Sequence, residues 1–239
     1  MRGTLIVGGS GGIGLELVHK LRKLGEDVVF TYRKEFEGLN QIEEKIGAKP
    51  INYDFQNVDS QNKLVDLVLS NEFIGLVNLA ALPVIRKSFL KINCEELVSR
   101  MDEELLGSLK LCQAFAQSCK KRNAKGSIVN VLTSYVLGIP PEKLLGYVMT
   151  KQAQLGMTRS LAIELAKMDI RVNSISPEMT RTKFISDLPE RFIEIAEEGL
   201  PFKRIASPLE VANVIAFLLS DDSSYITGAN IPITGGISC

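Results

Sequence analysis

Residues 4–14 read Thr-Leu-Ile-Val-Gly-Gly-Ser-Gly-Gly-Ile-Gly, and this stretch decides the fold. The apolar run at residues 4–7 predicts a strand, the amphipathic pattern at residues 15–24 predicts a helix, and residues 27–32 predict a second strand. In such a βαβ unit, glycines let backbone amides approach a pyrophosphate at the positive end of the helix dipole. The flanking elements therefore favour a dinucleotide-binding loop over a flexible surface loop.

The alternation of strands and helices continues along the chain. Strands are predicted at residues 50–53, 74–79, 127–132, 170–174 and 231–233, and helices at residues 60–69, 95–121, 145–166 and 209–219. This order predicts an α/β fold with one Rossmann-type, doubly wound parallel sheet of about seven strands and helices on both faces. The length suits a single domain over residues 1–239. Four prolines interrupt the pattern at residues 176–208, around a helical piece at residues 190–198, which predicts a substrate-binding loop or lid.

The composition excludes several classes of partner. Lys and Arg together number 28 and balance 28 Asp and Glu, so no net charge recruits nucleic acid or an anionic membrane. No apolar run approaches the roughly 18 residues that a membrane-spanning helix needs. The four cysteines, Cys94, Cys112, Cys119 and Cys239, show neither Cys-x-x-Cys pairing nor metal-site spacing. We therefore expect a small-molecule partner, no metal and a cytoplasmic location, and a structural role for His19.

The end of the second predicted strand carries basic residues. An NAD site has an acid roughly twenty residues beyond the glycines to bind the ribose 2′-hydroxyl, whereas an NADP site accommodates a phosphate with basic side chains. This chain reads Tyr32-Arg33-Lys34 at that point. Glu35 follows, but it falls where the next helix should begin, and an acid in a first helical turn compensates the helix dipole. These residues predict NADPH as the cofactor.

Polar residues follow several predicted strand ends. They are Asp54, Asn78, Thr133 and Ser134. Because ligands bind at the carboxyl ends of parallel strands, we expect these residues to share one edge of the sheet with the glycine turn. Each of them alone could be a turn residue or a helix cap, but four at one edge favour a binding site.

Tyr147 and Lys151 lie four residues apart in the predicted helix at residues 145–166, so they share one helical face. The pKa of a tyrosine hydroxyl is ordinarily about 10, and a neighbouring ammonium favours the phenolate and moves this pKa toward neutrality. Such a pair can donate a proton to a carbonyl oxygen. The same spacing is also that of a solvated helix edge, so its interpretation depends on the other motifs.

Together these motifs resemble those of the short-chain dehydrogenase/reductase family, and the resemblance covers essentially the whole chain. It implies that Tyr147 is the catalytic acid and that Lys151 binds the ribose of the cofactor. The residues that it implies in cofactor binding are Gly8, Ser10, Gly11, Gly12, Ile13 and Gly14 in the glycine turn, Tyr32, Arg33 and Lys34 after the second strand, Asp54 and Phe55 at the adenine, Asn78 and Ala80 in an Asn-Leu-Ala-Ala segment, Tyr147 and Lys151, and Pro177, Thr180 and Thr182 at the nicotinamide.

Three positions depart from the pattern of the family. Its catalytic serine falls on Thr133 when counted along the fifth strand and on Ser134 when counted back from Tyr147; we favour Ser134 and keep both as candidates. The helix asparagine that supports the family's proton relay corresponds to Glu104, whose carboxylate could hold the same water or block it. Glu178 stands where the family has the glycine of its Pro-Gly segment.

The resemblance is closest to 3-oxoacyl-[acyl-carrier-protein] reductases. It implies NADPH-dependent reduction of a small-molecule carbonyl compound, free or carrier-linked, by a homotetramer or homodimer that pairs the helices at residues 95–121 and 145–166. Two alternatives stay open. One is a catalytically poor NADP-binding regulatory or scaffold protein, suggested by Glu104, Glu178 and the altered Asn-Leu-Ala-Ala segment, and the other is an NAD(P)-dependent sugar or alcohol dehydrogenase.

Overall fold

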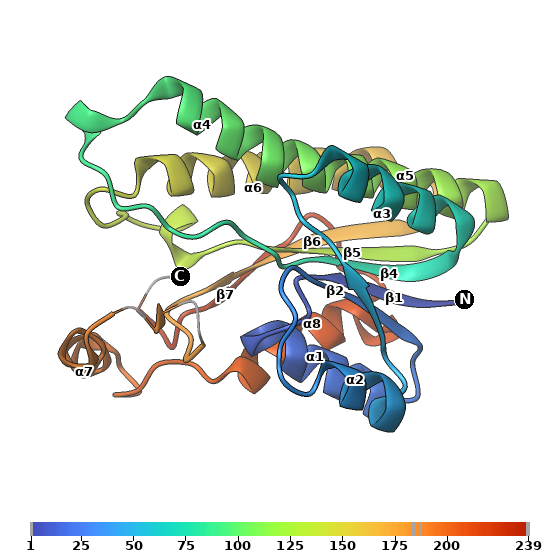
Figure 1. Cartoon of the computed structure of the whole chain (residues 1–239), viewed down its shortest axis with the longest axis horizontal. Coiled ribbons are helices and arrows are strands. Elements are labelled where there is room, and N and C mark those ends of the chain that lie inside the picture. The colour runs from blue at the N-terminus through green and yellow to red at the C-terminus, as the bar shows by residue number, and fades with distance from the viewer. Residues whose placement is uncertain (1, 183–184, 187, 238–239) are drawn as a thin grey trace.

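A parallel sheet forms the middle layer of the protein (Figure 1). The structure is a computed structural model that describes residues 2–182, 185–186 and 188–237, and within these residues seven strands pair in the order β3-β2-β1-β4-β5-β6-β7. Their bounds are β1 Arg2–Val7, β2 Val28–Tyr32, β3 Lys49–Asn52, β4 Glu72–Asn78, β5 Gly126–Val131, β6 Ile170–Pro177 and β7 Asn230–Ile233. The predicted α/β class with a doubly wound parallel sheet is confirmed.

The strand order reverses between β1 and β4. The chain proceeds outward from β1 through β2 to β3, returns to β4 on the other side of β1, and then continues to β7. Val7 of β1 pairs with Asn78 of β4, so both strands end at the same level. The carboxyl edge beside such a reversal is where open α/β sheets bind their ligands.

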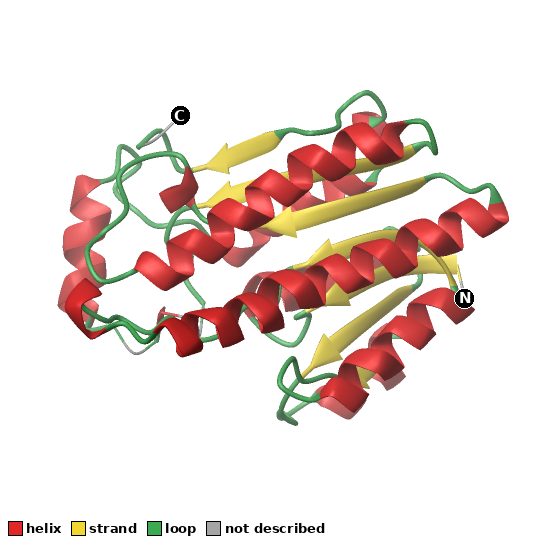
Figure 2. Ribbon diagram, turned by 90° about the horizontal axis from the view of Figure 1, so that it is seen from above, coloured by secondary structure: helices red, strands yellow, loops and turns green. Residues whose placement is uncertain are grey.

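Helices cover both faces of the sheet (Figures 1 and 2). One face carries α3 (Val58–Ser70), α4 (Cys94–Met101), α5 (Gly107–Arg122) and α6 (Leu145–Ala166), and the other carries α1 (Gly12–Lys23), α2 (Leu39–Gln41) and α8 (Pro208–Leu219). The short turns are η1 (Ile42–Ile46), η2 (Phe89–Lys91), η3 (Asp102–Leu106), η4 (Ser134–Val136) and η6 (Asp221–Ser223). α7 (Glu190–Gly199) lies beyond the carboxyl edge, away from both layers of helices.

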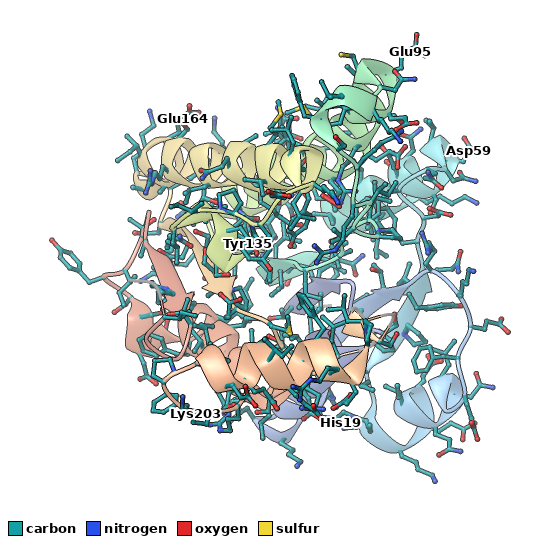
Figure 3. All side chains as sticks on the ribbon, turned by 90° about the vertical axis from the view of Figure 1, so that its left-hand side faces the viewer. His19, Asp59, Glu95, Tyr135, Glu164 and Lys203 are labelled. Carbon is teal, nitrogen blue, oxygen red and sulfur yellow. The ribbon has the colours of Figure 1, made fainter. Side chains whose placement is uncertain are left out.

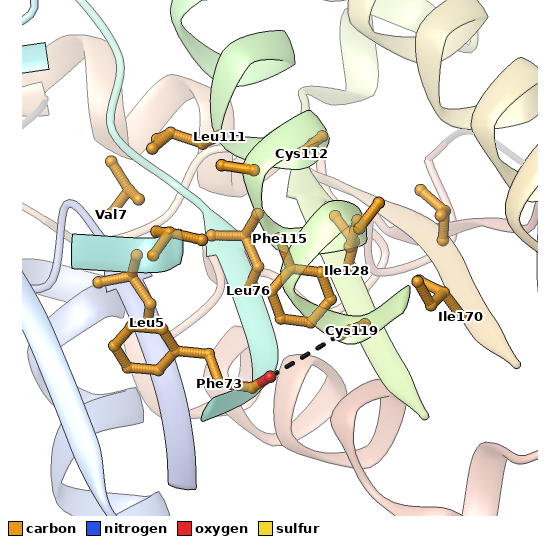
Figure 4. Close-up of a cluster of buried hydrophobic side chains, with 14 of the residues drawn as sticks. Leu5, Val7, Phe73, Leu76, Leu111, Cys112, Phe115, Cys119, Ile128 and Ile170 are labelled. Carbon is orange, nitrogen blue, oxygen red and sulfur yellow. Dashed lines mark hydrogen bonds between the residues drawn. The ribbon is translucent and has the colours of Figure 1, made fainter. Parts of the chain in front are cut away.

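Side chains along the inner strands alternate between two apolar clusters, one on each face of the sheet. Leu5 and Val7 belong to the cluster under α3 and α5, whereas Ile6 between them belongs to the cluster under α1 and α8. In the first cluster, the Phe115 ring of α5 packs beside Leu76 of β4 (Figure 4). Both faces are buried, which explains why the strands read as nearly continuous apolar runs.

Two helices differ from the prediction by more than two residues or by an interruption. The first helix begins at Gly12 rather than at residue 15, because the last glycines of the turn already form its first turn. The helix expected over residues 95–121 is interrupted by the π-helical turn η3 between α4 and α5. A π turn adds one residue to the helical repeat and so changes the face on which the following side chains lie. Here it contains Glu104, which is buried.

The segment expected to be a loop or lid has a small apolar centre of its own. Ile193 of α7 packs with Leu200 and Ile205, and Thr180 forms a parallel bridge with Ala206. Positions 183–184 and 187 of this segment lie outside the described residues. The assignment of the chain to one domain with a lid at residues 176–208 stays a prediction.

Some features that bear on location and cofactors are not found in the described part of the chain. No helix there is long and apolar enough to cross a membrane. No group of three or more His, Cys, Asp or Glu side chains among these residues could hold a metal ion. Cys94, Cys112 and Cys119 are free thiols, and Cys239 lies outside the described residues. His19 lies in α1, on the face of the sheet opposite α6 (Figure 3).

Candidate active site

The glycine turn after β1 is shaped by close backbone contacts. Gly8 has a φ of +95°, and a Cβ added there would lie 2.6 Å from the nitrogen of Ala80. A Cβ added to Gly14 would lie 2.3 Å from the carbonyl oxygen of Gly8. The N–H of Gly8 donates to Oγ1 of Thr31 at 2.9 Å, which ties the turn to β2. These positions therefore require glycine for the fold itself.

The N-terminus of α1 presents backbone amides that no N-cap side chain covers. Gly11 is the N-cap and has no side chain to cap the helix, and the first turn contains no acidic residue. A Cβ added to Gly11 would meet no atom within 4 Å. Open space beside the amides at the positive end of a helix suits an anion. This part of the turn, which includes Ser10 and Ile13, therefore fits the pyrophosphate of a dinucleotide.

The cations expected at the ribose phosphate lie at the end of β2. Tyr32 is the last residue of this strand, and Arg33 and Lys34 follow it with exposed side chains. The main chain here is held by Asn52 of β3, whose Nδ2 donates to the carbonyl oxygen of Arg33 at 3.2 Å. Exposed cations on an anchored backbone suit a phosphate, and Glu35 beside them is exposed as well.

Asp54 and Phe55, expected at the adenine, have different surroundings. Asp54 is half-buried, and its Oδ1 accepts a hydrogen bond from the N–H of Gln56 at 3.1 Å. The Phe55 ring is buried and packs edge-on against Tyr53, with 5.2 Å between the ring centres. The Phe55 ring therefore belongs to the core, and the adenine contact expected of this pair stays a prediction.

Asn78 at the end of β4 starts a line of buried amides. Its Nδ2 donates to Oδ1 of Asn130 at 2.8 Å, and Nδ2 of Asn130 donates to Oγ1 of Thr158 at 2.9 Å. The N–H of Ala80 donates to the carbonyl oxygen of Val7 at 2.8 Å, which holds the segment after β4 against the glycine turn. Asn78 thus connects β4, β5 and α6 below the carboxyl edge.

Thr133 is the hydroxyl residue that the structure brings to Tyr147. Its side chain faces Tyr147 closely enough to lower the pKa of the phenol. Ser134 is also buried, but it opens the 3₁₀ turn η4, for which Thr133 is the N-cap. Both hydroxyls therefore stay candidates for the catalytic position, and the contact with Tyr147 favours Thr133.

The pKa of Tyr147 is shifted in the direction opposite to the one expected from the sequence. Burial raises the pKa of Tyr147 to about 12, the Thr133 side chain opposes this effect, and the Glu104 carboxylate adds to it. The lowering expected from Lys151 is wrong here, because burial is the largest influence and the charge that lowers the pKa of Tyr147 is the Arg100 guanidinium. The phenol consequently keeps its proton near neutral pH, which is the form that a general acid needs.

Lys151 is enclosed by protein, with 3% of its surface exposed. Its Nζ donates to the carbonyl oxygen of Val131 at 3.2 Å and to Oε1 of Gln154 at 3.0 Å. Burial lowers the pKa of Lys151, whereas the Glu104 carboxylate raises it and the Arg100 guanidinium lowers it further. The ammonium is thus held by acceptors from β5 and from its own helix.

Glu104 forms a buried ion pair with Arg100, with 3.0 Å between Oε1 and Nη2. The same oxygen accepts a hydrogen bond from the N–H of Leu82. Arg100 donates to the carbonyl oxygens of Leu82 at 3.1 Å and Pro83 at 2.9 Å, and its guanidinium carbon lies 5.7 Å from the centre of the Tyr147 ring. The pair therefore holds the segment after β4 beside Tyr147.

The segment after β6 reaches the glycine turn. Pro177 ends β6, and Oγ1 of Thr180 donates to the carbonyl oxygen of Glu178 at 3.0 Å. The Thr182 side chain lies against the turn, because a Cβ added to Gly12 would be 2.6 Å from Cγ2 of Thr182. The residues expected at the nicotinamide thus lie beside those expected at the pyrophosphate.

Glu178 also influences Tyr135, which lies centrally at the carboxyl edge of the sheet (Figure 3). Burial raises the pKa of Tyr135, the Glu178 carboxylate raises it further, and the Arg86 guanidinium opposes both. A carboxylate and a guanidinium therefore act on a phenol close to Tyr147. Glu178 consequently adds a charge to this side of the site, where the family has a glycine.

Three polar residues around Tyr147 and Lys151 were not identified from the sequence. They are Arg100, Gln154 and Tyr135. Arg100 precedes Glu104 by four residues, which is the helical spacing of an ion pair and could have indicated it. Gln154 follows Lys151 by three residues, on the same helical face. No local pattern marks Tyr135, because it lies in a turn between β5 and α6.

Comparison with known proteins identifies the family. The family model described as enoyl-(acyl carrier protein) reductase matches residues 8–238. The chain belongs to the short-chain dehydrogenase/reductase family. It is therefore an NAD(P)-dependent oxidoreductase.

Its relatives in this family carry different names. It is 31% identical to the 3-oxoacyl-[acyl-carrier-protein] reductase MabA of Mycobacterium tuberculosis, over 99% of this chain and 92% of the relative. It is 31% identical to the L-xylulose reductase of Caenorhabditis elegans, over 98% of this chain and 94% of that protein. A solved structure of a short chain dehydrogenase/reductase family protein is 31% identical and superposes with a TM-score of 0.86, over 99% of this chain and 96% of that one.

A first prediction concerns the glycine turn. Gly14→Ala places a methyl group against the backbone of Gly8, so we expect the free energy of unfolding in urea to fall by about 1 to 3 kcal/mol. Gly11→Ala meets no protein atom, and Gly11 has an extended φ of −159°, so its unfolding free energy should stay within about 0.5 kcal/mol of the wild type.

Gly11→Ala nevertheless fills the space beside the α1 amides, so it should weaken NADPH binding in a fluorescence titration. Wild-type affinity for NADPH in this variant would show that the pyrophosphate does not lie there.

Proposed function

We propose that the protein is an NADPH-dependent carbonyl reductase. The observation that carries this proposal is the meeting of Tyr147, Thr133 and Lys151 at the same edge of the sheet as the uncapped N-terminus of α1. A proton donor, a second hydroxyl and a buried cation next to a dinucleotide turn are the groups that carbonyl reduction requires.

Each residue of the cluster has a defined task in this proposal. NADPH supplies the hydride when it is bound. Tyr147 donates its proton to the carbonyl oxygen, Thr133 hydrogen-bonds the same oxygen and orients it, and Lys151 stabilises the negative charge that develops on the phenol oxygen. The raised pKa of Tyr147 keeps the donor protonated before the reaction.

The proposed substrate is a 3-oxoacyl thioester or a related ketone, free or carrier-linked. It is supported by the likeness to a 3-oxoacyl-[acyl-carrier-protein] reductase over almost the full length of both chains. The likeness to an L-xylulose reductase keeps a sugar or alcohol dehydrogenase as the second candidate. The contacts of Tyr147 and Lys151 favour both over a catalytically poor scaffold protein, which would need neither group.

We propose NADPH rather than NADH because Arg33 and Lys34 replace the expected acid. A lost hydrogen bond to a charged group typically costs about 1.5 to 3 kcal/mol. Arg33→Asp should therefore raise the Michaelis constant for NADPH far more than that for NADH. Lys125→Asp changes the charge equally at an exposed site before β5 and should alter neither constant. Equal effects of Arg33→Asp on both cofactors would refute the preference.

Tyr147→Phe tests the general acid. The variant keeps the ring beside Arg100 but lacks the proton, so turnover should fall by about 10²- to 10⁴-fold while the NADPH dissociation constant stays nearly unchanged. Tyr225→Phe makes the same change at an exposed tyrosine and serves as the control. Near wild-type turnover in the Tyr147 variant, with NADPH bound, would favour the non-catalytic alternative.

We further propose a homotetramer or homodimer that pairs α5 and α6 with their symmetry mates. A groove of about 440 Å³ lies between these helices, lined by Leu109, Cys112, Gln113, Ala116, Gln117, Met157, Ser160, Leu161, Glu164 and Leu165. Ile163 of α6 is 81% exposed. An apolar face on two long helices suits association between copies of the chain. The free thiols fit the reducing cytoplasm that we propose as the location.

Light scattering at micromolar concentration should give about two or four times the mass of one chain. Met157→Glu puts a charge into the groove and should lower this mass to that of one chain, because burying an unpaired carboxylate at an interface is unfavourable. Ile139→Glu changes an exposed apolar residue elsewhere and should leave the mass unchanged. A wild-type protein with the mass of a single chain would refute the assembly.

A further inference from the structure

The Gln154 side chain connects two buried parts of the site. Its Oε1 accepts a hydrogen bond from Nζ of Lys151 at 3.0 Å, and its Nε2 donates to the main-chain carbonyl oxygen of Glu104 at 3.4 Å. Gln154 is itself 4% exposed. A single amide therefore joins the ammonium on α6 to the π-helical turn η3.

The chemistry of the two neighbours explains why this residue is a glutamine. An ammonium can only donate hydrogen bonds, and a main-chain carbonyl can only accept them. A side chain between Lys151 and the carbonyl of Glu104 must therefore present an acceptor on one side and a donor on the other. An amide does so in one orientation, whereas a leucine or methionine offers no strong hydrogen-bonding group and a carboxylate offers no donor.

The main chain of Gln154 is also fixed. Its carbonyl oxygen accepts a hydrogen bond from Oγ1 of Thr158 at 2.8 Å, and Thr158 accepts from Nδ2 of Asn130 in β5 at 2.9 Å. Asn130 in turn accepts from Asn78 at the end of β4. This buried line ties α6 to the two strands one helical turn from Gln154.

We propose that Gln154 is a positioning residue for Lys151. Its amide fixes the Lys151 ammonium between β5 and the π-helical turn. Two of the three N–H bonds of the ammonium then point to Val131 and Gln154, which leaves one for Tyr147 or a bound cofactor. This role rests on the proposed function, because it assigns Lys151 to the reaction.

The charged and titratable groups around Lys151 determine in which direction each substitution of Gln154 should shift the pKa of Lys151. The Glu104 carboxylate on η3 favours the ammonium and the Arg100 guanidinium on α4 disfavours it, while Tyr147 on α6 keeps its proton. An acceptor at Gln154 favours the ammonium too. Removing that acceptor should lower the pKa of Lys151, and replacing the amide by a carboxylate should raise it.

The experiment compares Gln154→Met with Gln154→Glu. Methionine has nearly the same shape but cannot accept a strong hydrogen bond from the ammonium, and glutamate keeps the acceptor and adds a negative charge. The pKa of Lys151 is read by NMR titration of the full chain labelled with ¹³C at lysine Cε, and its resonance is assigned by its loss in Lys151→Met. We expect the pKa to fall by about one pH unit in the first variant and to rise by about one in the second.

Gln152→Met is the matched control. Gln152 lies on the same helix with an exposed side chain that donates to the carbonyl oxygen of Val136, so the same chemical change should leave the Lys151 titration unchanged. A residue that merely fills the interior would affect thermal stability without opposite pKa shifts. Equal titrations in wild type and both Gln154 variants, or shifts of the same sign, would overturn the proposal. If one variant does not fold, the other still tests the proposal, because the direction of its Lys151 pKa shift is predicted separately.

A kinetic measurement separates this proposal from the proposed function. With NADPH and an acetoacetyl thioester, the alkaline limb of the kcat/KM profile should move to lower pH in Gln154→Met and to higher pH in Gln154→Glu. A wild type that turns over none of the carbonyl substrates would refute the proposed function. The NMR titration needs no turnover, so it would still decide whether Gln154 holds Lys151.

Discussion

The burial of the Lys151 ammonium is the constraint on which the candidate site depends. A charge taken out of water must find acceptors and compensating charge inside the protein. Val131 at the end of β5 and Gln154 on α6 provide the acceptors, and the Glu104 carboxylate provides the charge. β5, α6 and the π-helical turn consequently hold fixed positions around this one group.

The ion pair between Arg100 and Glu104 extends this arrangement to the neighbouring strand. Glu104 accepts from the main chain of Leu82, and Arg100 donates to the carbonyl oxygens of Leu82 and Pro83. The chain after β4 is thereby held between the glycine turn and Tyr147. The two charges can persist in this interior because each compensates the other. Removing either partner would leave a buried charge without its counterpart.

The sequence predicted the elements that local patterns determine. The glycine turn and the alternation of strands and helices led to the parallel sheet, and the ends of the strands led to Asn78 and Thr133 at its carboxyl edge. The π-helical turn was missed because one inserted residue barely disturbs an apolar period. The direction of the Tyr147 pKa was missed because burial depends on residues far away in the chain. Gln154 was missed because a polar residue on a helix shows its partners only after folding.

A crystal structure of the full chain with NADPH would test the site most directly. We expect the pyrophosphate on the amides at the start of α1, the 2′-phosphate beside Arg33 and Lys34, and the nicotinamide facing the Tyr147 hydroxyl. A dinucleotide bound away from the glycine turn, or a nicotinamide directed away from Tyr147 and Lys151, would contradict the assignment of these residues to carbonyl reduction.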